Sequence, residues 1–96
     1  LMSKKELLWV HSRPTCDAGF YNKYEAAILN VYDYKASFVV EELVCDERGR
    51  YRLFLDQFLL SEYDSKDLGI YATVKDACAA ADEEYSNVHT LLSSQL

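Results

Sequence analysis

The last quarter of the chain carries an apolar stripe at helical spacing, and this stripe constrains the fold more than any other feature. Thr73 stands before it, with an acid three residues later at Asp76, which is typical of a helix N-cap. We therefore predict an amphipathic helix over residues 74–92 that packs through one face on the rest of the chain. The stripe consists of Val74, Ala77, Cys78, Ala81, Tyr85, Val88 and Leu92.

The middle of the chain predicts a β-hairpin. β-Branched residues are frequent in residues 36–45, and the charged segment 46–49, which ends in glycine, is typical of a turn. Residues 50–56 form the expected return strand, in which Tyr51, Leu53 and Leu55 share one face. A helix over residues 51–59 is the alternative, because the apolar residues there also fit helical spacing. The turn residues favour the hairpin.

The first third of the chain is expected to contribute a strand and a helix. Residues 6–11 form an apolar run typical of a short strand, and residues 12–19, which include Pro14, predict a loop. Apolar residues at intervals of three and four then predict a helix over residues 20–34, although Leu29 falls on its polar side.

The complete pattern predicts an α+β fold. Residues 61–69 are polar and acidic and predict a loop, and residues 70–72 predict a short edge strand. The expected architecture is a small antiparallel sheet with two helices packed on it, in the order β-α-β-β-β-α. We expect a single domain over residues 2–96, with Leu1, ahead of Met2, as a cloning remnant.

Composition favours a protein of the reducing cytoplasm. The apolar stretches are far shorter than the ~20 residues of a membrane-spanning helix, and the run after Met2 is too short for a signal peptide. Cys16, Cys45 and Cys78 are odd in number and widely spaced, which favours reduced thiols over disulfides or a metal site. We expect a cytoplasmic protein that binds neither metal nor membrane.

The sequence has no pair of residues at catalytic spacing. Cys78 and His89 would lie roughly 16 Å apart along one helix, whereas a nucleophile and its base must be about 3 Å apart. His11 and Cys16 have no residue to orient them, and the three glycines are too isolated to form a phosphate-binding loop. We therefore expect no enzymatic activity and no cofactor.

Acidic residues are unevenly distributed. The net charge is −6, yet residues 41–84 hold twelve acids against five bases, and residues 1–40 hold four acids against five bases. This charge disfavours direct binding of nucleic acid and favours a partner protein with a basic surface. A solvated face that only confers solubility is the alternative. The candidate acidic binding residues are Asp76, Asp82, Glu83, Glu84, Glu41 and Glu42.

Aromatic and basic residues supply further candidates. Tyrosine makes up eight of the thirteen aromatic residues, and exposed tyrosines are frequent at protein interfaces. Arginines around Tyr51 would suit single-stranded nucleic acid, although neighbouring acids favour a salt-bridged turn. The candidates are Tyr21, Tyr32 and Tyr63 for a partner protein, and Arg48, Arg50 and Arg52 for the basic cluster.

In size, charge and architecture the chain resembles the anti-CRISPR and anti-restriction proteins of phages and mobile elements. The resemblance covers no diagnostic motif and carries no site residue across. It implies a non-catalytic inhibitor in the bacterial host cytoplasm, monomeric or homodimeric, which docks an acidic surface on a basic, nucleic-acid-binding surface. The alternative is a subunit or antitoxin-like protein that acts through an apolar, tyrosine-rich surface. Added salt would weaken the first kind of binding and hardly change the second.

Overall fold

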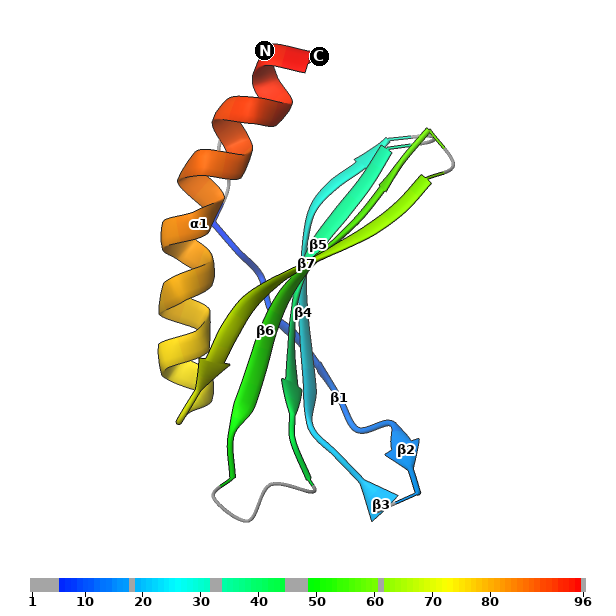
Figure 1. The fold of residues 1–96 in the computed structure, drawn as a ribbon, viewed down its shortest axis with the longest axis vertical. Coiled ribbons are helices and arrows are strands. Elements are labelled where there is room, and N and C mark those ends of the chain that lie inside the picture. The colour runs from blue at the N-terminus through cyan, green and yellow to red at the C-terminus, as the bar shows by residue number, and fades with distance from the viewer. Residues whose placement is uncertain (1–5, 18, 32–33, 45–48, 61, 96) are drawn as a thin grey trace.

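The computed structural model describes residues 6–17, 19–31, 34–44, 49–60 and 62–95. These residues form an antiparallel sheet with one long helix on one face (Figure 1). The elements are β1 (Val10–Ser12), β2 (Thr15–Cys16), β3 (Gly19–Phe20), β4 (Lys23–Val31), β5 (Tyr34–Glu42), β6 (Tyr51–Leu59), β7 (Glu62–Tyr71) and α1 (Val74–Gln95). The main sheet has the strand order β1-β4-β5-β6-β7, and β2 and β3 form a separate small hairpin.

The predicted hairpin and the predicted C-terminal helix are confirmed. β5 and β6 pair antiparallel along their whole length, so the helical alternative for residues 51–59 is wrong. α1 begins at Val74, as predicted, and ends at Gln95, beyond the predicted residue 92. The Thr73 hydroxyl oxygen accepts a hydrogen bond from the Asp76 backbone N–H over 3.1 Å, which is the expected N-cap contact.

The predicted helix over residues 20–34 is wrong, because its centre forms strand β4. A β-bulge between Ala27 and Leu29 is the physical reason for the error. Ala26 lies in the core before the bulge, and Leu29 lies in the core after it, so the buried positions are three residues apart. Such spacing imitates a helix. The order β-α-β-β-β-α with two helices is therefore wrong, since the described residues contain one helix.

The predicted loop over residues 61–69 is also wrong, because β7 extends over Glu62–Tyr71 and includes most of the short edge strand expected over residues 70–72. β7 is an edge strand and its side chains are mostly exposed, so it lacks the apolar alternation of a buried strand. At the N-terminus, β1 covers Val10–Ser12 instead of residues 6–11, and the loop predicted over residues 12–19 contains β2 and the first residue of β3.

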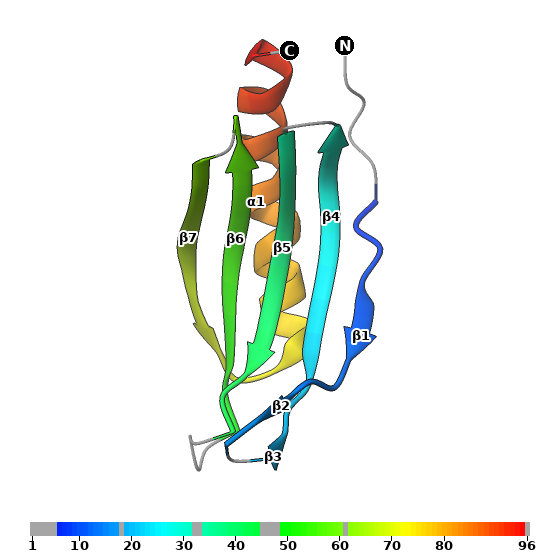
Figure 2. The same cartoon turned by 90° about the vertical axis from the view of Figure 1, so that its right-hand side faces the viewer.

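The core lies between the sheet and α1. Phe38, Leu53 and Leu55 are fully buried on the helix side of the sheet, opposite Ala81 and Tyr85 of α1. The rings of Phe38 and Tyr85 meet edge to face at 6.3 Å between centroids. Figure 2 shows that the opposite face of the sheet, here called the open face, has no helix on it. In the part of the chain that the structure describes, no helix has the length and hydrophobicity to span a membrane.

Candidate functional site

Folding gathers most of the negative charge on two adjacent elements, β7 and α1. Together they carry seven carboxylates against two lysines, a net charge of −5. The three central strands β4, β5 and β6 carry four carboxylates against three basic residues, a net charge of −1. Of the two edge strands of the main sheet, β7 is the one in contact with α1, and the end of β7 lies beside the start of α1 (Figure 1). The uneven charge along the sequence thus becomes an uneven charge in space.

A groove of about 230 Å³ lies between β7 and α1. Leu53, Leu68 and Ala80 contribute apolar surface to it, and Glu83 and Glu84 contribute carboxylates from α1. Lys66 of β7 reaches across to the Glu84 carboxylate, with Nζ 3.2 Å from Oε1. This pair ties the strand to the helix beside the groove.

The four predicted acidic residues of α1 lie on two sides of the helix. Glu83 and Glu84 line the groove, and Asp76, two turns before Glu83, shares its exposed line. Asp82 points about 100° away from Glu83 around the helix axis. Asp82 lies beside Cys78. Burial is the larger cause that raises the pKa of the Cys78 thiol, and the charge of Asp82 raises it further.

Glu41 and Glu42 lie near the end of β5, two strands away from β7. The Glu42 carboxylate oxygen accepts hydrogen bonds from the Asn22 backbone N–H at 3.0 Å and from its side-chain amide at 3.1 Å. Glu42 therefore fastens the start of β4 to β5. The structure separates both residues from the acids of β7 and α1.

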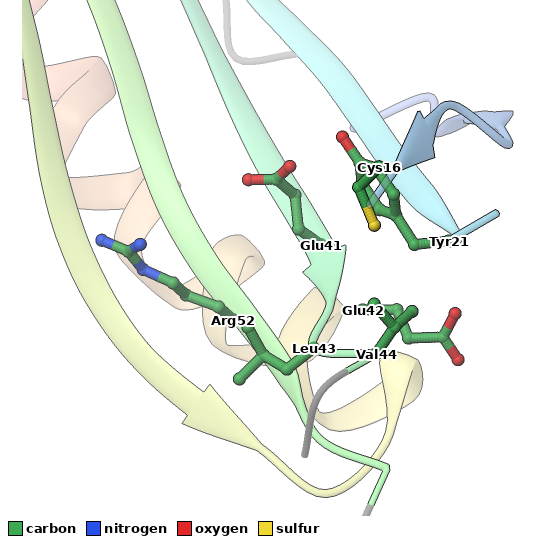
Figure 3. A pocket seen from close by; sticks show the side chains of 7 residues that line it. All are labelled: Cys16, Tyr21, Glu41, Glu42, Leu43, Val44 and Arg52. Carbon is green, nitrogen blue, oxygen red and sulfur yellow. The ribbon is translucent and has the colours of Figure 1, made fainter. Parts of the chain in front are cut away.

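A second pocket, of about 360 Å³, lies at the end of the sheet near β2. Figure 3 shows Cys16 and Tyr21 next to each other at this pocket, with Glu41 close by and the Arg52 guanidinium directed away from them. Desolvation raises the pKa of the Tyr21 phenol, and the charge and hydrogen bond of Glu41 raise it further. The Tyr21 phenol is therefore a hydrogen-bond donor toward the Glu41 carboxylate.

The predicted aromatic and arginine candidates differ in their exposure and in their contacts. Tyr63 is 65% exposed, as predicted, and its hydroxyl donates a hydrogen bond to Asp56 over 2.7 Å. Tyr21 is half-buried. Arg52 pairs with Asp67 of β7 at 3.3 Å and lies over the Phe54 ring, so its own partner is an acid that sequence spacing did not identify. Tyr32 and Arg48 lie outside the described residues, and Arg50 is half-buried.

The described thiols and imidazole form no nucleophile and base pair. Cys16 and Cys78 are free thiols, and no described group of three or more His, Cys, Asp or Glu residues has the geometry of a metal site. The His11 ring is hydrogen-bonded to Asn22 at 2.8 Å and stacked on Tyr24 at 4.6 Å. Cys45 and the side chain of His89 lie outside the description.

Sequence reasoning missed two surfaces, the open face and the free edge of β7. The open face carries the exposed side chains of Phe58 and Tyr63, which are directly opposed across β6 and β7, and the exposed side chain of Ile70 near the other end of β7. The face of residues 50–56 opposite Tyr51, Leu53 and Leu55 holds Phe54, and this apolar residue was the available signal. The free edge had no signal, because its residues are typical of a loop.

No protein-family model matches the chain, and no match was found among the curated proteins or the solved structures compared with it. A function must therefore be inferred from the arrangement of the chain's own residues.

Proposed function

We propose that the chain is a non-catalytic binding protein that docks an acidic surface on a basic surface of a larger assembly and thereby masks it. The acidic surface consists of Glu62, Asp64, Asp76, Glu83 and Glu84, on β7 and on the side of α1 that faces β7. The observation that carries the proposal is the net charge of −5 on these two elements. Like charge concentrated on one side attracts and orients a partner of opposite charge.

A nucleic-acid-binding surface is the class of basic surface that this arrangement suits best. Such a surface is built to receive rows of phosphates. Asp76 and Glu83 present carboxylates along one exposed line of a rigid helix, next to the acids of an extended strand. The protein would then inhibit its partner by occupying the nucleic-acid site, as the resemblance to anti-CRISPR and anti-restriction proteins implies.

Affinity capture with paired variants tests this proposal. The first variant combines Asp76→Lys and Glu83→Lys on the acidic surface. The matched control combines Asp17→Lys and Glu25→Lys, at exposed positions near β2 and on β4, and changes the net charge by the same amount. We expect the wild type and the control to capture the same basic protein from the source cell, and duplex DNA to displace it. Equal capture by both variants would contradict the proposal.

A second candidate function rests on the open face. Phe58 on β6 and Tyr63 on the edge strand β7 are 37% and 65% exposed and lie directly opposite each other, and Ile70, near the other end of β7, is 51% exposed. Exposed apolar and tyrosine side chains on one face of a sheet favour a subunit or antitoxin-like partner. Capture that is lost in Ile70→Ser and Phe58→Ser, and that is insensitive to salt and to DNA, would favour this second function.

A further inference from the structure

The outer edge of β7 has unpaired backbone groups. The Glu42 N–H donates to the Asn22 carbonyl, and the Leu43 N–H donates to the Arg50 carbonyl, both at 2.9 Å. Antiparallel pairs alternate, so even residues of β5 bond to β4 and odd residues bond to β6. By the same alternation, β6 bonds to β5 through its even residues and to β7 through its odd residues. The odd residues of β6 are paired with Glu62 and Asp64 of β7, so the N–H and C=O groups of Tyr63 and Ser65 point away from β6. β7 ends the strand order, so these groups face outward.

The two faces of this edge differ in chemistry. Glu62 and Asp64 are on the same face as Lys66, which contacts α1, so their carboxylates are on the helix side with Glu83 and Glu84. Tyr63 is on the open face, where it contacts Asp56. A strand placed along the edge would have acids beside one of its faces and an aromatic ring beside the other.

The same charges disfavour a second copy of this chain. Two β7 edges brought together would place the net charge of −5 on β7 and α1 of one copy next to the same charge on the other copy, and this repulsion disfavours pairing. A β-bulge at Leu68 also interrupts the edge, which leaves the part from Glu62 to Asp67 for pairing. Charge complementarity therefore selects a basic strand as the occupant.

We infer that the β7 edge accepts an extended segment of the partner protein as an additional antiparallel strand, in which basic residues alternate with apolar residues. The basic side chains lie on the helix side, and one of them extends its aliphatic stem into the groove lined by Leu68 and Ala80, with its cationic head at Glu83 or Glu84. The apolar side chains lie on the open face beside Tyr63. This inference rests on the proposed function, because it specifies how a basic partner reaches the acidic surface.

The register predicts which backbone groups of the segment are used. Directly opposed residues of an antiparallel pair have side chains on the same face. The residues that bond to Tyr63 and Ser65 must therefore be the apolar ones. A synthetic peptide in which lysine and valine alternate over about ten residues, a common strand length, is the probe. One derivative is N-methylated at every valine, and the other at every lysine, so that charge is the same in both.

We expect the unmodified peptide and the lysine-methylated peptide to bind in fluorescence anisotropy. The valine-methylated peptide should bind at least about tenfold more weakly, since it loses the hydrogen bonds to β7. Equal affinity of the two methylated peptides, or the reverse order, would overturn the inference.

Substitution of the protein gives an independent test. Ser65→Pro removes an outward N–H without removing a bond to β6, a place where edge strands tolerate proline. Ser65→Ala is the control that keeps the N–H. We expect Ser65→Pro, and not Ser65→Ala, to lose the peptide and the natural partner. If Ser65→Pro retains the partner and the Asp76 and Glu83 variant loses it, strand addition is wrong and the proposed function stands. The opposite pattern would contradict the proposed function.

Discussion

At the scale of single residues, Ala81 shows how closely the helix must approach the sheet. Its side chain is fully buried in the core that includes Phe38 and Tyr85. Ala81→Asp would place an unpaired carboxylate and additional volume in that core, so we expect a loss of about 3 kcal/mol or more in the free energy of unfolding. Urea denaturation measures it. Ala79→Asp, on the exposed side of the same helix, should unfold near the wild-type midpoint, and equal midpoints for both variants would contradict the packing.

Tyr63 has a hydroxyl whose ionisation reports on the open face. The hydrogen bond to Asp56 is the largest cause that raises its pKa above 10.0, and desolvation adds to it. Because the pKa is raised in the folded state, this interaction stabilises the fold below the unfolded pKa and is lost as pH rises through the folded pKa. Asp56→Asn should move the titration of Tyr63, followed by NMR of the tyrosine ring carbons, toward its ordinary value. Asp76→Asn, which removes a distant charge, should leave it in place.

At the scale of elements, local signals predicted what local residues determine. The Thr73 cap and the stripe through Ala77 and Ala81 fixed α1, and the glycine-containing turn fixed the hairpin of β5 and β6. β4 and β7 depend on their neighbours in the sheet. In β4, a bulge changes the face of the sheet on which Leu29 lies, and in β7, a bulge interrupts the side-chain alternation at Leu68. Neither sequence therefore has the regular alternation that predicts a strand. In the sequence, the sign against a helix was Leu29, an apolar residue on the polar side of the predicted helix. The structure buries this residue.

The bulge of β7 leads to a prediction for Gly69. Its φ of 111° is in a region that other residues rarely adopt, and its N–H donates to the Asp67 carboxylate over 3.0 Å. A Cβ at this position would meet only ordinary contacts, the nearest being the Tyr71 hydroxyl at 3.5 Å. Backbone strain alone should therefore make Gly69→Ala about 1–3 kcal/mol less stable.

Urea denaturation again provides the measurement for Gly69→Ala. Ser65→Ala, on the same strand, is the control, and we expect its midpoint to remain near that of the wild type. A Gly69→Ala protein as stable as this control would mean that the bulge is not held in the conformation described.

At the scale of the whole molecule, the sheet and helix separate the surface into an acidic side and an open face. The uneven charge was visible in the sequence, and Glu83, Glu84 and Asp76 were identified from it. The contributions of Glu62 and Asp64 were not identified, because only the pairing of β7 with β6 puts these acids on an edge strand, on the face of the sheet that carries α1. Glu41 and Glu42 were included because they lie in the acidic half of the sequence, although the sheet places them two strands away from β7.

The central claim is that the position of the acidic surface, rather than total charge, drives association. The most direct test is the association rate constant with the captured partner, measured over a series of salt concentrations for three proteins. Wild type and the Asp17 and Glu25 control should associate rapidly at low salt and slow steeply as salt is added, because screening shortens the reach of the charges. The Asp76 and Glu83 variant should associate slowly, with little dependence on salt. Identical rates and salt dependence in all three proteins would contradict the claim.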